Sequence, residues 1–193
     1  MRFNPDKCEV LIATNKKSPI HSEYTIHGQV LNQTDSAKYL GLNIHKNLSW
    51  DSHIDKITKK ANPTLAFLGR NVSHCPTTIK AQCYTTLVRP TLEYASSIWS
   101  PSKKDSINKV EAVQRRAAMF ATGDYQRTST VTAMLQHLKW QTLKSRRAYA
   151  QTVITWVSAS IPITGTKFTR HLPIDVRDWF FSSLINLVVL IKL

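Results

Sequence analysis

The stretch that decides the fold is residues 49–70, SWDSHIDKITKKANPTLAFLGR. Its apolar residues recur at intervals of three and four positions, as they do along one face of an α-helix. The members of this stripe are Ile54, Ile57, Ala61, Leu65 and Leu68. Ser49 or Asp51 can cap the helix, and Gly69 is a candidate stop. Pro63 lies inside the pattern and is expected to kink or interrupt the helix.

Helical periodicity continues toward the carboxyl terminus. Pro90 is expected to bend or end the second helical segment, after which apolar residues at helical spacing resume. Gly123 is expected to close the third segment, as glycine does at helix ends. The predicted segments cover residues 76–99, 102–122, 129–138 and 143–157.

The amino-terminal residues favour strands instead. Short runs of β-compatible residues cover 8–14, 23–31 and 38–45, and His27-Gly28 suggests a tight turn. Gly41 falls inside the third run, where glycine often marks a bulge or the close approach of another backbone. The predicted fold is therefore α+β and mostly α, with a small antiparallel β unit before a helical bundle, and strands confined to roughly the first 45 residues.

Charge points to a polyanionic partner. The 193 residues carry a net charge of +14, and 42% are hydrophobic, so the chain is not a disordered basic tail. Half of the excess charge lies in residues 103–147, which hold ten basic and three acidic side chains. Nucleic acid is the expected partner, and an anionic membrane surface is the alternative.

Other functions find little support in the residues. Three cysteines are too few for a zinc module, and Asp51, His53 and Asp55 would spread around a helix rather than share a metal. We expect no metal, cofactor or small-molecule substrate, and an intracellular location in nucleus or cytoplasm, because the amino terminus lacks a signal peptide. The apolar tail, 179–193, is too short to span a bilayer and is expected to form a buried or frayed helix.

An ordered series of motifs carries a family resemblance over residues 2–150. The motifs are FNPDKCEVL, SAKYLGLNI, LSWDSHIDKITKKA, LVRPTLEYASSIWSP and KVEAVQRRAAMFATGDYQRTSTVTAMLQHLKWQTLKSRR. In this order they resemble the carboxy-terminal third of reverse transcriptases from non-LTR (LINE, jockey-like) retrotransposons. Asn4 and Lys7 match a segment at the back of the palm in such enzymes.

The resemblance implies a layout and a partner. Tyr39, Leu40 and Gly41 resemble the primer-grip hairpin, and the helices that follow resemble the thumb, which cradles a template–primer duplex. The implied segments are a palm remnant (1–49), thumb-like helices (50–122), post-thumb basic helices (123–157) and a divergent apolar tail (158–193). We expect non-specific binding of an RNA–DNA hybrid or duplex through phosphates. Candidate contacts are Lys56, Lys59, Lys60, Arg70, Lys109, Arg115, Arg116, Arg127, Arg146 and Arg147.

Catalysis is not expected of this chain alone. Its twelve acidic residues include no adjacent pair, whereas two-metal phosphoryl transfer needs paired carboxylates. The resemblance places those carboxylates, and their Mg²⁺, in an upstream polymerase portion, so the chain is interpreted as a fragment. Arg89 is expected to pair with Glu93 at i, i+4 rather than bind nucleic acid. The alternatives are an interaction or structural fragment, and a remnant of a mobile element without function.

Overall fold

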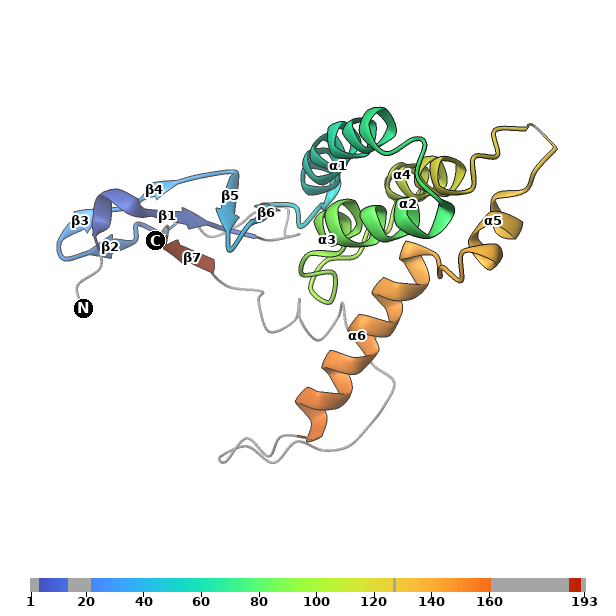
Figure 1. Ribbon diagram of the computed structural model, residues 1–193. Coiled ribbons are helices and arrows are strands. Elements are labelled where there is room, and N and C mark those ends of the chain that lie inside the picture. The colour runs from blue at the N-terminus through green and yellow to red at the C-terminus, as the bar shows by residue number, and fades with distance from the viewer. Residues whose placement is uncertain (1–3, 14–21, 127, 161–187, 192–193) are drawn as a thin grey trace. The chain divides into compact units, whose positions relative to one another are not determined.

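The chain folds into two compact units. The computed structural model describes residues 4–13, 22–126, 128–160 and 188–191. Unit 1 comprises the described parts of Met1–His53 and Ile161–Leu193, and unit 2 is Ile54–Ser160. Strands lie in unit 1 and nearly all helices in unit 2 (Figure 1). The predicted fold class, α+β and mostly α, is confirmed, while the finer division at residues 49, 122 and 157 stays a prediction.

Unit 1 is built from short strands. One 3₁₀ turn, η1 (Pro5–Lys7), precedes them and is capped by Asn4, whose Oδ1 accepts a hydrogen bond from the Asp6 amide. The strands are β1 (Cys8–Leu11), β2 (Thr25–Ile26), β3 (Gln29–Val30), β4 (Asn32–Gln33), β5 (Ser36–Tyr39), β6 (Leu42–His45) and β7 (Val188–Ile191).

Strand β1 lies at the centre of a three-stranded sheet. It pairs in parallel with β4 and antiparallel with β7. The expectation of a wholly antiparallel unit is therefore wrong for the β1–β4 pair. The prediction of a helix in the tail is also wrong at β7, so strands are not confined to the first 45 residues. The apolar run VVLI suits a strand that occupies the second edge of β1. The other residues of the predicted tail helix, apart from β7, lie outside the described residues.

Two hairpins complete unit 1. His27 and Gly28 connect β2 to β3 with φ angles of 53° and 79°, so the predicted tight turn is confirmed. Leu40 and Gly41 connect β5 to β6 with φ angles of 44° and 86°. Positive φ at both central positions defines a type I′ turn, which matches the twist of the two strands. Gly41 therefore lies in a turn and not inside a strand, which corrects the prediction of a bulge.

The core of unit 1 lies on both faces of β1. Cys8 and Val10 pack with Leu31 on one face. Leu11 packs with Ala37 on the other face. Because successive side chains of a strand point to opposite faces, a four-residue strand can serve both clusters.

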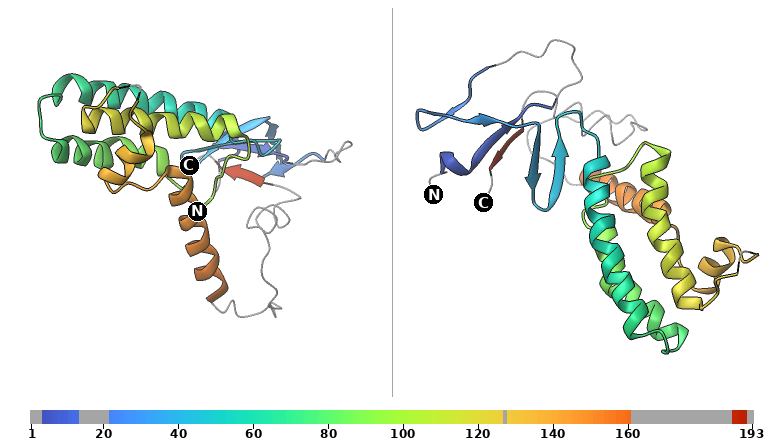
Figure 2. Two further views of the ribbon diagram at one scale, coloured as in Figure 1. Left: turned by 90° about the vertical axis from the view of Figure 1, so that its right-hand side faces the viewer. Right: turned by 90° about the horizontal axis from the view of Figure 1, so that it is seen from above.

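Unit 2 is a helical bundle, although its first helix begins in unit 1. Its elements are α1 (Asp51–Asn71), α2 (Thr77–Cys83), the π-helical turn η2 (Tyr84–Val88), α3 (Arg89–Glu93), α4 (Lys104–Thr122), α5 (Val131–His137) and α6 (Leu143–Ser160). Figure 2 shows α1 and α4 as two long helices lying side by side. Helical spacing does not continue to Trp99 as predicted, because the chain leaves the helix at Tyr94 (ψ 125°) and Ala95 (φ 52°).

The apolar stripe of α1 forms part of the unit 2 core. All five predicted members are buried, with exposed fractions between 0% and 8%. Pro63 does not interrupt the helix, which continues to Asn71. Pro63 has no N–H to donate to the Lys59 carbonyl four residues earlier. Because both residues are exposed, water can hydrogen-bond to that carbonyl instead. The helix ends two residues after Gly69, where the Asn71 side chain donates to the Phe67 carbonyl (2.8 Å).

Pro90 shapes the middle of the bundle. Its ring would clash with the Thr86 carbonyl in a regular α-helix, and the widened turn η2 directly precedes α3. Tyr84 and Val88 of this turn are completely buried. The Tyr84 ring packs on Trp140, with ring centroids 4.6 Å apart.

Candidate nucleic-acid interface

The surface of α1 that faces away from the core is strongly basic. At about 100° per residue, six exposed residues from Lys56 to Arg70 fall within an arc of about 100° opposite the buried stripe. We call this surface the outer arc. It consists of Lys56, Lys59, Lys60, Pro63, Phe67 and Arg70. No acidic residue follows Asp55 on α1, so the charge of the outer arc has one sign.

Helix α4 lies along one edge of this arc. Lys109 Nζ is 2.7 Å from Asp55 Oδ1, and Arg116 Nη2 donates to Asn62 Oδ1 at 2.6 Å. Both contacts join residues 54 positions apart, so α1 and α4 run in the same direction (Figure 2). The two contacts are seven residues apart on each helix, which corresponds to about 10 Å.

These contacts extend the basic surface across two helices. Four of the predicted phosphate contacts lie on the outer arc, and Lys109 and Arg116 lie beside it on α4. We call these six cations the basic face: Lys56, Lys59, Lys60, Arg70, Lys109 and Arg116. Arg115 is exposed as well, but it lies about 100° around α4 from Arg116 and so points away from this edge.

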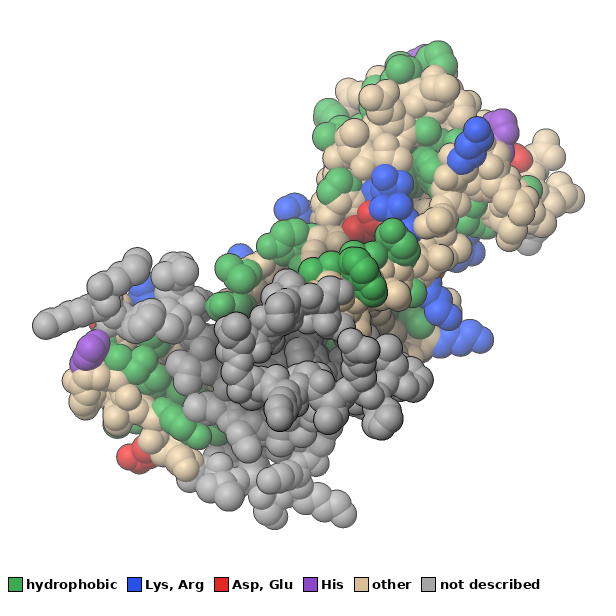
Figure 3. Space-filling model, turned by 90° about the horizontal axis from the view of Figure 1, so that it is seen from below, with side chains coloured by type: hydrophobic (Ala, Val, Ile, Leu, Met, Phe, Trp, Pro, Cys, Tyr) green, Lys and Arg blue, Asp and Glu red, His purple; other side chains and the backbone are tan. Residues whose placement is uncertain are grey.

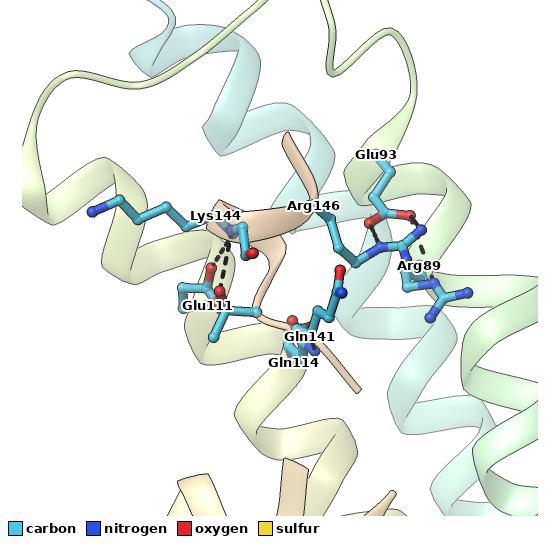
Figure 4. A network of polar contacts seen from close by, with 9 residues as sticks. Arg89, Glu93, Glu111, Gln114, Gln141, Lys144 and Arg146 are labelled. Atoms are coloured by element: carbon cyan, nitrogen blue, oxygen red, sulfur yellow. Dashed lines mark hydrogen bonds and ion pairs between the residues drawn. The ribbon is translucent and has the colours of Figure 1, made fainter. Parts of the chain in front are cut away.

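Arg146 has an intramolecular partner. Its Nε and Nη2 both donate to the Glu93 carboxylate, the second bond being 3.1 Å long (Figure 4). Hydrogen bonding to Glu93 raises the pKa of Arg146 above its usual value. Arg89 Nε lies 3.6 Å from the same carboxylate, which confirms the predicted i, i+4 pair. Arg146 therefore ties α6 to α3, and its bidentate geometry is satisfied within the protein.

Arg147 is buried, with an exposed fraction of 2%. Its guanidinium lies over the Trp99 ring, 5.4 Å from the centroid. Burial lowers its pKa, and the nearby Glu111 and Glu93 carboxylates oppose that effect. The prediction that Arg147 meets a phosphate at the surface is corrected, because the side chain that follows Arg146 on α6 points into the core.

The start of α6 is held by side chains of α4. The Lys144 amide donates to Glu111 Oε1 (2.7 Å), and Gln114 Nε2 donates to the Gln141 carbonyl (2.8 Å), as Figure 4 shows. Thr142 Oγ1 also accepts a hydrogen bond from the Ser145 amide (3.1 Å). These contacts at the start of α6 have no signal in the sequence, apart from one. Only the Thr142 cap had a local signal, since threonine is common immediately before a helix.

The residues that resemble a primer grip lie at the tip of a hairpin. Tyr39, Leu40 and Gly41 are all exposed there, in unit 1. The same hairpin lines a pocket of about 270 Å³, to which β1 and α1 also contribute, through Glu9 and Ser52. Arg127, which was also predicted to contact phosphate, lies outside the described residues.

Among residues 4–13, 22–126, 128–160 and 188–191, no group of three His, Cys, Asp or Glu side chains is placed to hold a metal ion. In the same residues, no helix is both long and apolar enough to cross a lipid bilayer.

Comparison with known proteins gives three relatives, all from Drosophila melanogaster. The chain is 28% identical over 121 residues to the probable RNA-directed DNA polymerase from transposon BS. The aligned stretch covers 61% of the chain and 13% of that protein. It is 23% identical over 138 residues to the RNA-directed DNA polymerase from mobile element jockey, covering 68% and 15%. It is 26% identical over 94 residues to the probable RNA-directed DNA polymerase from transposon X-element, covering 47% and 10%.

No protein-family model matches the chain, and no solved structure is significantly similar to it. The chain spans only 10% to 15% of the length of the three relatives. Over part of its length, the chain is thus similar to the RNA-directed DNA polymerases of non-LTR retrotransposons, as its ordered motifs predicted.

Proposed function

We propose that this chain is a segment of a retrotransposon RNA-directed DNA polymerase whose own role is to hold nucleic acid without reading its sequence. The observation that carries the proposal is the basic face, in which Lys109 and Arg116 of α4 contact α1 beside the cations of its outer arc. The three relatives support it, because each is named as a polymerase that copies RNA into DNA.

The chemistry of the basic face suits phosphates better than base edges. Its six charged members are lysines and arginines, which bind phosphate oxygens through charge and hydrogen bonds. Contacts to phosphate position a protein on a duplex but carry no sequence information directly. A polymerase that copies any template needs a hold of this kind, and an RNA–DNA hybrid is the partner that the relatives suggest.

We further propose that the chain does not catalyse polymerisation by itself. No two of its twelve acidic residues are adjacent, whereas nucleotide transfer by two metal ions requires carboxylates held close together. In this proposal a separate polymerase portion supplies the carboxylates and the magnesium ions. The segment described here would then contribute affinity for the template and primer, and not the chemical step.

A salt titration tests the proposal. The affinity of the chain for an RNA–DNA hybrid of about 20 base pairs is measured by fluorescence anisotropy between about 50 and 200 mM salt, where phosphate contacts make affinity fall steeply. The double variant Lys59→Glu, Lys60→Glu should bind at least about tenfold more weakly and show a salt slope smaller by about two.

The control keeps the type of charge change but moves it to another surface. The substitution Lys144→Glu lies on α6, whose start packs on the side of α4 that carries Glu111. Its affinity should stay within about twofold of the unmodified chain. Affinity that does not depend on salt, or an equal loss in the control, would overturn the proposal.

A second function is favoured by a different observation. Hydrophobic side chains gather on the face of unit 2 that Figure 3 shows, beside acidic and basic side chains. Exposed apolar residues on α6 include Tyr149, Val153 and Val157, with exposed fractions of 72%, 41% and 40%. Such a surface is typical of a protein interface, so the alternative is an interaction segment through which two copies of the chain pair. Light scattering of the chain and of Tyr149→Lys tests for self-association, and a monomer in both cases would argue against pairing of two copies.

A further inference from the structure

One aromatic side chain stands within the outer arc of α1. Phe67 is 55% exposed, and it lies on the same face as Lys60 and Arg70. The neighbouring positions on α1 explain why it is at the surface. Leu65 and Leu68 occupy the buried stripe, and Phe67 cannot join them without turning the helix by about a third of a revolution.

The charges around this ring are arranged along the helix axis. At about 1.5 Å per residue, Lys60 lies about 10 Å before Phe67, and Arg70 lies about 5 Å after it. Pro63 is exposed one turn before Phe67 on the same arc, and its ring adds apolar surface. The outer arc thus offers a flat apolar area with a cation on each side of it.

We propose that Phe67 is a stacking platform for an unpaired base of single-stranded nucleic acid, with Lys60 and Arg70 holding the phosphates on either side of that base. This inference rests on the proposed function and deepens it, because it adds an unpaired strand to the partners of the basic face. A cationic groove combined with an aromatic surface is how proteins bind single strands without sequence preference.

The composition of the outer arc agrees with such a role. It contains neither the amide side chains that pair with adenine edges nor the carboxylates that accept hydrogen bonds from cytosine. Every base has a flat face, so stacking on Phe67 would tolerate any sequence. A strand leaving the duplex could therefore pass along α1 whatever its sequence.

The test compares a strand that has bases with one that lacks them. Fluorescence anisotropy is measured with a twelve-nucleotide oligothymidylate and with an abasic oligonucleotide of the same length and charge. Phe67→Ala should weaken binding of oligothymidylate by about five- to a hundredfold, which is the range for losing one stacked base. Binding of the abasic strand should stay within about twofold.

Three variants separate stacking from other causes. Phe67→Trp should restore or exceed the original affinity for oligothymidylate, because it keeps an aromatic face, whereas Phe67→Leu should bind as weakly as Phe67→Ala. Ile79→Ala removes an exposed apolar side chain on α2 (44% exposed) that lies outside the outer arc, and it should leave both affinities unchanged. Circular dichroism checks that all variants keep their helical content.

The experiment distinguishes failure of the Phe67 platform from failure of the proposed function. If Phe67→Ala binds both strands like the unmodified chain, the platform is wrong, while a loss caused by Lys59→Glu, Lys60→Glu would still support the proposed function. If neither set of variants changes binding, both proposals fall. A change in oligomeric state of Phe67→Ala without any effect on binding would instead indicate that Phe67 contacts another protein and would overturn the platform.

Discussion

Arg146 on α6 donates two hydrogen bonds to the carboxylate of Glu93 on α3, although the two residues are 53 positions apart in the sequence. The Glu93 side chain is largely buried and that of Arg146 is half-buried, with exposed fractions of 18% and 38%. Arg89 approaches the same carboxylate from one turn earlier on α3. One acidic side chain thus joins two arginines, and it fixes where the last helix of unit 2 begins.

Removing the charge of Glu93 should loosen this junction. Glu93→Gln leaves two arginines beside a neutral amide and removes charge-assisted bonds, so the free energy of unfolding should fall by about 1–3 kcal/mol. Urea unfolding followed by circular dichroism measures this change. Arg146→Lys keeps the charge but loses the two-point geometry, and it should show a smaller loss. Unchanged stability of Glu93→Gln would mean that the junction is not important for the fold.

Arg147 should prove dispensable for binding. Its guanidinium is buried, and Nη1 has no hydrogen-bond partner among the described residues. Arg147→Met fills a similar volume without the cost of burying a charge, so unfolding free energy should stay equal or rise. Affinity for an RNA–DNA hybrid should not change, in contrast to Lys59→Glu, Lys60→Glu. A tenfold loss of affinity in Arg147→Met would contradict this prediction and indicate that Arg147 contacts phosphate.

Tyr84 should make the fold sensitive to alkali. Burial raises the pKa of its hydroxyl far above the usual value of 10.0. Unfolded tyrosine therefore loses its proton first as the pH rises, and stability is constant below about pH 10 and falls above it. Because the hydroxyl has no hydrogen-bond partner among the described residues, Tyr84→Phe should keep its stability at neutral pH and lose part of the alkaline decline. Thermal unfolding midpoints between about pH 8 and 11 report this difference; parallel curves for both proteins would contradict it.

Asp55 should restrain nucleic-acid binding. Its carboxylate holds Lys109 at the edge of the outer arc and is the one acidic group near the basic face on α1. Asp55→Asn removes that charge, so affinity for the hybrid at low salt should rise several-fold and the salt slope should steepen by about one. Both side chains of the pair are about half exposed, so unfolding free energy should change by less than about 1 kcal/mol. Weaker binding of Asp55→Asn would count against phosphate contact by Lys109.

A substitution in the turn between β5 and β6 should stabilise this hairpin. Leu40 holds a left-handed φ of 44°, a conformation that leucine rarely adopts and asparagine tolerates well. Leu40→Asn should therefore raise the stability of the hairpin by about 0.5–1 kcal/mol. Slower amide hydrogen exchange in β5 and β6 is the expected readout. Gly41→Val at φ 86° is the opposite control and should speed exchange.

Most of the fold could be predicted from local sequence patterns. The stripe of α1, the glycine that closes α4 and the turn at His27-Gly28 are properties of neighbouring residues, and each was predicted correctly. Two of the errors arose where a distant segment or solvent decided the outcome. Strand β7 pairs with β1 across more than 170 residues, and Pro63 is tolerated because it faces water.

The sequence by itself determined the family resemblance, the helical majority and the one-signed charge of the outer arc of α1, because these follow from residue order and from spacing along a single helix. Only the tertiary structure decided which cations remain at the surface. Arg146 and Arg147 are neighbours in sequence, yet one binds Glu93 and the other is buried on Trp99, while Lys109 and Arg116 lie beside α1. The physical reason is that adjacent helical residues point about 100° apart, so their partners depend on which helix packs against each face.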